Sequence, residues 1–330
     1  MSLRAKITGV GHYVPPKVLT NKELEKMVDT NDEWITTRTG IKERHILEDG
    51  KGSSYMGALA AQRALEEAKM NPEDLDLIVV ATVTPDMMFP NTACLIQDEI
   101  GAKNAWGVDV NGACTGFLYA TSMASQFIES GRYKKVLVVG ADKMSAITDY
   151  TDRNNCILFG DAAAAIVLEP SDDPEYGILD FIMKSDGSGS KYLYMLGGGS
   201  LHPATHETVD KKMHYIYQDG RAVFKFAVSG MADITEEIVK KHNIESENIK
   251  LLIPHQANLR IIDATARRLK LDPEKVMVNI DKYGNTTAAT IPLGLSEAYQ
   301  EGRIKKGDIV LFAAFGAGFT WGSMLLRWAI

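Results

Sequence analysis

The chain has 330 residues, of which 45% are hydrophobic, and its formal net charge is -7. A chain of this length can bury a large core, and we expect two domains or a duplicated one. The negative charge argues against nucleic acid as a general partner, because no global positive field attracts phosphates.

The cysteine content and the apolar runs indicate the cellular setting. The chain has three cysteines, an odd number, and these do not make a disulfide framework in a chain of this length. They favour a reducing environment. The first residues lead directly into a predicted strand without a signal-peptide pattern, and no apolar run has the length that crosses a bilayer. We therefore expect a cytoplasmic protein with no membrane partner.

Strand-like apolar runs alternate with helix-like segments in chain order. The predicted strands are 77–83, 136–139, 157–159, 164–168, 251–253, 276–280 and 309–314. The predicted helices are 54–68, 116–130, 224–242 and 259–269. Near-continuous apolar strands are typical of sheets covered on both faces, so the pattern predicts an α/β fold. The polar segment 169–174, with its two prolines, separates an N-terminal half (1–174) from a C-terminal half (175–330).

The two halves repeat each other. The letters GRYKK at 131–135 and GRIKK at 302–306 each precede a predicted strand, at an offset of 171 residues. The same offset brings Cys114 onto Asn285, and each of them follows a strand and precedes a helix pattern. We therefore predict that Cys114 and Asn285 occupy equivalent positions in two copies of one α/β unit and approach a shared seam.

Cys114 is the first candidate for chemistry. It lies at the start of a predicted buried helix, where the helix dipole and unpaired N–H groups favour a thiolate. A thiolate is what covalent catalysis by cysteine requires. The alternative is a small, inert core residue. Cys94 and Cys156 are expected to be core residues of that kind.

Three further elements point to the same chemistry. His255 follows a buried strand, where α/β sheets place active sites, although structural histidines also occur there. Asn285 follows a glycine in a pair that is also typical of a turn. The segment 315–322 is either a plain turn or a source of backbone N–H groups for a ligand. It lacks the third glycine of a dinucleotide-binding motif, because Trp321 stands at that position. Together these groups suit the formation of a thioester enolate and its condensation with an acyl-cysteine.

The chain resembles the β-ketoacyl-[acyl-carrier-protein] synthase III family, the initiating condensing enzymes of bacterial fatty acid synthesis. The resemblance extends over nearly the whole chain. Its motifs, in chain order, are 32–41, the Cys114 loop, 159–164, 255–258, 284–286 and 316–322. It implies a thiolase-like fold with five layers, α-β-α-β-α, formed by two duplicated halves, and it implies a homodimer.

The resemblance also assigns the catalytic roles. Cys114 takes an acyl group from acyl-CoA, and His255 and Asn285 then bind the malonyl thioester and promote its decarboxylation. The resulting carbanion attacks acyl-Cys114 and gives a 3-oxoacyl-[acyl-carrier protein]. The N–H groups of Cys114 and of the Gly316-Ala317 turn form the oxyanion hole. No metal and no permanently bound cofactor are implied, and acyl-CoA is a substrate.

Binding surfaces follow from the same resemblance. Trp34 and Arg153 match a pair that stacks on the adenine of coenzyme A, as an indole and a guanidinium can. The other coenzyme A-binding residues are Thr30, Arg38, Phe224 and Asn258. Phe89 matches a residue that closes the acyl pocket of the partner subunit, and its alternative is a core position.

Acyl carrier protein is an acidic partner and needs a local basic surface for docking. The residues assigned to that surface are Gln256, Ala257, Asn258, Leu259, Arg260, Lys225, Arg267 and Arg268. The alternative for such a run of charges is an ordinary solvated helix face.

Other functions remain open on the sequence. A related enzyme of a specialised secondary-metabolite pathway would load a different acyl-CoA. A cysteine hydrolase using Cys, His and Asn is opposed by the doubled architecture and by the lack of disulfides and a secretion signal. A non-catalytic acyl-CoA binder is opposed by the intact set of Cys114, His255 and Asn285. The sequence does not fix whether an acetyl or a branched primer is preferred.

Overall fold

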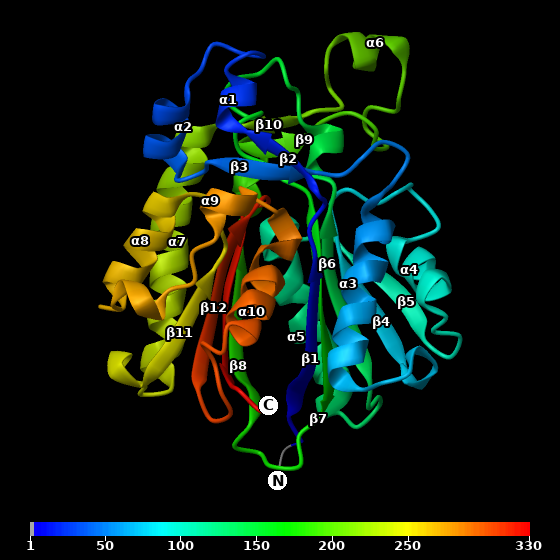
Figure 1. The fold of residues 1–330 in the computed structure, drawn as a ribbon, viewed down its shortest axis with the longest axis vertical. Helices are drawn as coiled ribbons and strands as arrows, with labels where there is room; N and C mark the ends of the chain where they lie inside the picture. Colours follow the sequence, from blue (N-terminus) through cyan, green and yellow to red (C-terminus); the bar gives the residue numbers. More distant parts are fainter. Residues whose placement is uncertain (1–2) are drawn as a thin grey trace.

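The computed structural model describes residues 3–330, and two β-sheets form its framework (Figure 1). The first sheet has the order β1-β7-β6-β4-β5. Its strands are β1 (Ala5–Tyr13), β4 (Leu77–Ala81), β5 (Trp106–Val110), β6 (Val136–Asp142) and β7 (Ala162–Pro170). The second sheet has the order β11-β12-β13-β8. Its strands are β8 (Gly177–Ser185), β11 (Ile249–Pro254), β12 (Ile309–Gly316) and β13 (Thr320–Arg327).

Helices form three layers around these sheets (Figure 1). The central layer is α5 (Gly116–Glu129) and α10 (Thr290–Gln300). The outer helices are α3 (Ser53–Ala68) and α4 (Thr92–Ile100) on the first sheet, and α7 (Gly220–Lys241) and α8 (Leu259–Arg268) on the second. The predicted five-layer α-β-α-β-α architecture is therefore confirmed.

Alternation along the strands explains the layering. On β4, Val79 packs in the central core with Phe117 of α5, whereas Ile78 packs in an outer core with Ala61 of α3. Successive strand residues point to opposite faces, so a strand that is apolar throughout must be covered on both. The apolar runs that suggested covered sheets in the sequence have this environment.

The same connections occur in both sheets. β6 pairs parallel with β4 and antiparallel with β7, and β12 pairs parallel with β11 and antiparallel with β13. In the first sheet Leu77 pairs with Val136, and in the second Leu251 pairs with Val310. Both members of the pair thus shift by 174 residues between the two copies.

The predicted equivalence of Cys114 and Asn285 was wrong. The offset is 174 at the start of the central helices and 171 at their ends, because α5 has 14 residues and α10 has 11. The offset of 174 brings Cys114 onto Ala288 and Asn285 onto Asn111. The two 3₁₀ turns that precede the helices, η2 (Ala113–Thr115) and η7 (Thr287–Ala289), correspond residue by residue.

Two predicted strands are absent as strands. Segment 157–159 forms only the bridge Phe159–Asn285, and 276–280 forms only the bridge Leu252–Val276. In the second case the backbone N–H groups of Asn279 and Ile280 donate to the side chain of Gln256, so they leave the ladder and enter α9.

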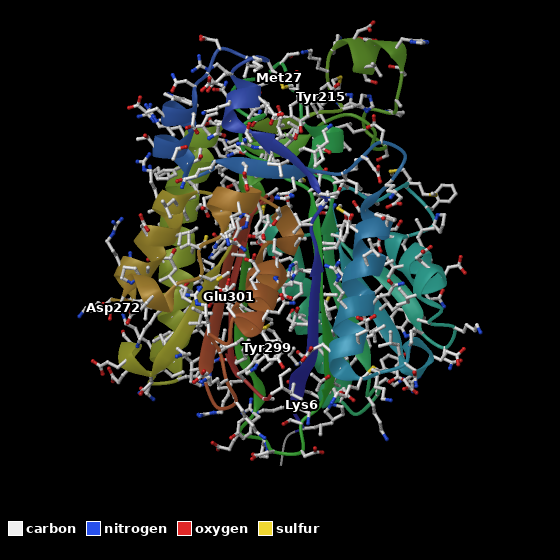
Figure 2. The ribbon with its side chains drawn as sticks, viewed as in Figure 1. Lys6, Met27, Tyr215, Asp272, Tyr299 and Glu301 are labelled. Carbon is white, nitrogen blue, oxygen red and sulfur yellow. The ribbon has the colours of Figure 1, made fainter. Side chains whose placement is uncertain are left out.

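The remaining elements complete the fold. Several gather beyond the carboxyl ends of the parallel strands, at the upper end of Figure 1, and both termini lie at the lower end. The other strands and helices are β2 (Lys17–Thr20), β3 (Glu43–Ile46), β9 (Leu193–Met195), β10 (Ile216–Gln218), α1 (Asn21–Leu24), α2 (Asp32–Thr39), α6 (His206–Asp210) and α9 (Ile280–Tyr283). The other 3₁₀ helices are η1 (Pro72–Asp74), η3 (Met144–Ile147), η4 (Gly187–Lys191), η5 (Ser246–Asn248) and η6 (Pro273–Lys275). Figure 2 shows Met27 and Tyr215 at the upper end and Lys6 near the lower one. Within residues 3–330, none of the helices has the length and apolarity to cross a membrane.

Candidate active site

A cavity of about 1240 Å³ lies beyond the carboxyl ends of β11 and β12. Cys114, His255 and Asn285 all line it, and so do Gly316 and Ala317. Residues from both halves of the chain therefore meet in one space, as the sequence predicted. Open α/β sheets place their sites at this edge.

Cys114 is held by an unusual turn. Ala113 has a φ of +48°, and the chain then turns through η2 into α5. A Cβ atom built on Gly316 would lie 3.0 Å from the backbone nitrogen of Cys114. A side chain at Gly316 would therefore crowd this N–H group, so glycine allows the end of β12 to approach it.

Burial dominates the acidity of Cys114, whose residue surface is 7% exposed. Burial raises the pKa of the thiol to about 12, and the charge of Asp142 acts in the same direction. Hydrogen bonds from the Cys114 backbone and the Asn285 side chain lower the pKa by less. The expected thiolate was therefore wrong for the unacylated site, because desolvation outweighs the favourable helix start.

His255 lies one residue beyond β11 and is 1% exposed. Its backbone N–H donates to the carbonyl oxygen of Ala313, which fixes the residue at the end of the sheet. Burial lowers the pKa of His255 to about 3, so the imidazole is neutral near pH 7. Its Nδ1 is buried and has no hydrogen-bond partner among the residues that the structure describes. A neutral imidazole has one N–H donor and one acceptor nitrogen.

Asn285 is oriented by its neighbours. Its backbone N–H donates to Leu158 O, and its own carbonyl accepts from Gly160 N. The side-chain Oδ1 accepts a 2.9 Å hydrogen bond from the N–H of Thr287. Because Oδ1 is occupied in this way, Nδ2 is the free donor, and the side chain hydrogen-bonds toward the Cys114 sulfur.

A pair of hydroxyls supports the Gly316-Ala317 turn, and no sequence pattern predicted it. Thr320 Oγ1 donates to Ala317 O at 2.9 Å and lies 3.1 Å from Thr115 Oγ1. Thr115 in turn donates to Thr320 O. These contacts join the turn after β12 to the segment that carries Cys114.

A buried carboxylate near the site was also missed. Asp142 is the last residue of β6, and a carboxylate at the end of an apolar strand was the signal in the sequence. It is completely buried, and burial raises its pKa to about 6.

The predicted coenzyme A residues lie around the outer part of the cavity. Trp34, Arg38, Phe224 and Asn258 line it, whereas Thr30 and Arg153 are not lining residues. The Arg153 guanidinium lies 5.2 Å from the centre of the Trp34 ring and also pairs with Asp29. Trp34 and Arg153 thus contact each other directly.

The predicted basic surface is only partly available. Arg260, Lys225 and Arg267 are exposed, and Arg260 lies over the Phe224 ring at 4.7 Å. Arg268 is paired with Asp233 and Glu236 on α7.

Gln256 was wrongly predicted to lie on the docking surface. It is 2% exposed, and its amide binds Pro254 O, Met277 O and the start of α9. It stabilises the loop from within and offers no docking surface. Ala257, Asn258 and Leu259 are half-buried, and Asn258 caps α8 through Arg260 N.

Two further residues, Phe89 and Cys94, lie on the surface and not in the core. Phe89 is 84% exposed, and the adjacent Met87 and Met88 are also exposed, so the core alternative does not hold. Cys94 is exposed at the start of α4, and its predicted core position was wrong, whereas Cys156 is buried as predicted. Over residues 3–330, no group of three or more His, Cys, Asp or Glu side chains is arranged to hold a metal ion.

Known proteins match this chain along most of its length. Residues 108–187 match the family model described as 3-oxoacyl-[acyl-carrier-protein (ACP)] synthase III, and 239–328 match the model of its C-terminal part. The chain is 55% identical over 327 residues to a β-ketoacyl-[acyl-carrier-protein] synthase III of Koribacter versatilis, which covers 99% of this chain and 98% of that protein.

Solved structures give the same result. The 3-oxoacyl-[acyl-carrier-protein] synthase III of Aquifex aeolicus is 48% identical with a TM-score of 0.90, covering 98% of this chain and 100% of that one. The priming β-ketosynthase of the R1128 polyketide pathway is 34% identical with a TM-score of 0.92, covering 99% and 97%. These similarities confirm the predicted thiolase-like fold.

Proposed function

Because this chain belongs to the β-ketoacyl-[acyl-carrier-protein] synthase III family, we propose that it condenses a short acyl-CoA with malonyl-[acyl-carrier protein]. The products are a 3-oxoacyl-[acyl-carrier protein], carbon dioxide and free CoA, and the reaction initiates fatty acid synthesis. The observation that carries the proposal is the meeting of Cys114, His255 and Asn285 in one buried cavity. The two catalytic halves are 1–174 and 175–330.

The first step is acyl transfer to Cys114. The sulfur attacks the thioester carbonyl of acyl-CoA, the new C–S bond forms, and the bond to CoA breaks. The carbonyl oxygen carries the developing negative charge and binds the N–H groups of Cys114 and the Gly316-Ala317 turn. Because Cys114 is a thiol at rest, its proton leaves during the attack and ends on the CoA sulfur.

The second step makes the carbon nucleophile. Neutral His255 and the Nδ2 group of Asn285 each donate a hydrogen bond to the thioester oxygen of the malonyl group. Loss of carbon dioxide leaves an enolate, whose negative oxygen these two donors stabilise. The enolate carbon attacks the acyl-Cys114 carbonyl, a C–C bond forms, and the C–S bond breaks to release Cys114 as a thiolate. This thiolate takes up a proton from solvent and restores the resting thiol. Burial disfavours the protonated form of His255, which suits the residue as a neutral donor.

Recognition takes place at the outer part of the cavity. We assign the adenine of CoA to Trp34 and Arg153, with Thr30 and Arg38 in the same region and Phe224 and Asn258 along the pantetheine arm. The acidic carrier protein docks on the exposed cations Lys225, Arg260 and Arg267 of α7 and α8, of which Arg260 lines the cavity.

We propose that the chain acts as a homodimer in the cytoplasm. β5 is the edge strand of the first sheet and is half-exposed along most of its length. The exposed Phe89 loop lies just before α4, which packs on β5. An exposed aromatic side chain beside a free sheet edge suits insertion into a second copy. The three cysteines are all unpaired, as in a reducing compartment.

The decisive experiment is a panel of acyl-CoAs incubated with the protein, followed by mass measurement of the Cys114 peptide. A stable acyl adduct on Cys114, followed by condensation and carbon dioxide release from malonyl-[acyl-carrier protein], supports the proposal. Cleavage of peptides or simple hydrolysis without a carbon–carbon bond would overturn it. The similarity to the R1128 priming ketosynthase makes a specialised pathway the second candidate. The acyl group that loads best on Cys114 decides between that pathway and the initiation of fatty acid synthesis.

A further inference from the structure

The two central helices begin with the same backbone but different neighbours. Ala113 and Thr287 have left-handed φ values of +48° and +51°, and each directly precedes a buried residue of its turn, Cys114 or Ala288. A strand end faces each start: β12 ends at Gly316 beside Cys114, and β6 ends at Asp142 beside Ala288. Gly316 and Asp142 are themselves related by the offset of 174 residues.

The contrast lies in what each strand end presents. At α5, Gly316 has no side chain, and the N–H of Cys114 remains available to a substrate oxygen. At α10, the Oδ2 atom of Asp142 accepts the N–H of Ala288 at 3.1 Å. A carboxylate of the protein thus stands where its counterpart site would bind a negative oxygen. An anion at a helix start is favourable on electrostatic grounds.

The other oxygen of Asp142 is held equally firmly. Oδ1 accepts the N–H groups of Val83 and Thr84 at 2.8 and 3.2 Å. It also accepts the hydroxyls of Thr82 and Thr84 at 3.1 and 2.9 Å. With both oxygens bound on opposite sides, the carboxylate clamps η7 to the segment after β4.

The clamp acts on a catalytic side chain. Ala288 follows Thr287, whose N–H holds Oδ1 of Asn285 and thereby sets the direction of Nδ2. We propose that Asp142 is a positioning residue for the decarboxylation step, which fixes η7 so that the Asn285 amide points at the thioester oxygen. This inference rests on the proposed function of Asn285. It gives Asp142 no contact with substrate.

The test separates the two half-reactions in the full-length protein. We expect Asp142→Ala and Asp142→Asn to slow carbon dioxide release from malonyl-[acyl-carrier protein] by about 100-fold, the effect of misplacing a catalytic group by roughly 1 Å. Acylation of Cys114 by acyl-CoA should fall much less, and this reaction verifies that the variants are folded. Both oxygens of Asp142 accept hydrogen bonds from N–H groups. In Asp142→Asn one oxygen becomes an NH₂ group, which faces these donors and cannot accept from them, so a side chain of the same shape does not restore the rate.

Chemical rescue distinguishes a clamp from a general structural role. Added formate should restore part of the decarboxylation rate of Asp142→Ala, because a small carboxylate can occupy the vacated position at Ala288 N. Thr82→Val is the matched control, since it removes one donor to Oδ1 and leaves the Ala288 contact, and it should lose far less. Equal loss of acylation and decarboxylation, without formate rescue, would overturn the proposal.

A parallel Asn285→Asp variant tests the proposed role of Asn285 in decarboxylation. If Asn285→Asp abolishes decarboxylation and Asp142→Asn does not slow it, only the role of Asp142 fails. If Asn285→Asp itself retains full decarboxylation, the assigned role of Asn285 fails.

Discussion

At the inner end of the cavity Cys114, His255 and Asn285 are almost inaccessible. At its mouth Arg260 is open to solvent, and so are Lys225 and Arg267 on the helices α7 and α8. The inner side chains have altered acidities or fixed hydrogen bonds, because desolvation and backbone contacts act on them. The charges at the mouth are screened by water and salt. Substitutions inside should therefore change rates, and substitutions at the mouth should change affinities and their dependence on salt.

The largest effect is expected for Cys114→Ala. Without the sulfur no acyl-enzyme forms, and condensation should fall on the order of 10⁴-fold or more. Mass measurement should show no adduct with any acyl-CoA. Cys156→Ala, a substitution at another buried cysteine, should retain the adduct, and loss of loading there would contradict a unique role for Cys114.

Asn285→Asp should be nearly as severe for one half-reaction. The variant keeps the size of the side chain and the acceptor for Thr287 N–H but lacks the Nδ2 donor. We expect carbon dioxide release to fall about 10²- to 10³-fold, as when an oxyanion donor is removed. Release of labelled carbon dioxide from radiolabelled malonyl-[acyl-carrier protein] provides the measurement. Asn285→Gln is the comparison, because it keeps the amide but moves it by one methylene group.

Trp34→Ala changes a lining residue in the outer part of the cavity. Loss of the indole should raise KM for acyl-CoA about tenfold or more, in the range of base-stacking energies, with little change in kcat. Trp34→Phe keeps an aromatic face and should lie between the two. A fall in kcat at unchanged KM would place Trp34 in the chemistry instead.

The double variant Lys225→Glu with Arg260→Glu should have a smaller effect that depends on salt. KM for malonyl-[acyl-carrier protein] should rise several-fold at low ionic strength, and the difference should shrink as salt increases. Loading of Cys114 from acyl-CoA should stay near normal. Arg268→Ala is the control, because its side chain is already paired with Asp233 and Glu236.

The smallest predicted effect concerns stability. The folded-state pKa of His255 is about 3 against an ordinary 6.5, so the unfolded chain binds a proton that the folded chain rejects. His255 therefore stabilises the fold less as pH falls from 6.5 toward 3. The pKa of Asp142 is raised to about 6, so this carboxyl contributes more to the stability of the fold as pH falls from 6 toward 3.8. His255→Gln should weaken the acid destabilisation, as measured by urea unfolding at several pH values.

Sequence reasoning succeeded where a local pattern has one physical meaning. The apolar strands and the helix patterns predicted a repeated α/β architecture, and the residues after strand ends pointed to Cys114, His255 and Asn285. The five-layer arrangement followed from the family resemblance. It failed where the outcome depends on distant packing. The offset of 171 residues holds between Gly131 and Gly302, after the central helices. Because α10 is three residues shorter than α5, the offset before these helices, at Cys114, is 174.

The remaining differences have the same origin. The thiol form of Cys114 follows from desolvation by both halves of the molecule, which no local motif records. Gln256 carries a polar side chain in a loop motif, yet the loop turns it inward onto the start of α9. Arg268 meets acidic partners on α7, which is distant in sequence.

The contact between Gly316 and the Cys114 backbone has a consequence for how such a duplicated protein can change. The glycine belongs to the second copy and the N–H group to the first, so the proposed oxyanion hole draws on both copies. The substitutions that one copy tolerates therefore depend on the geometry of the other copy. A side chain at Gly316 in the second copy would displace the Cys114 backbone in the first.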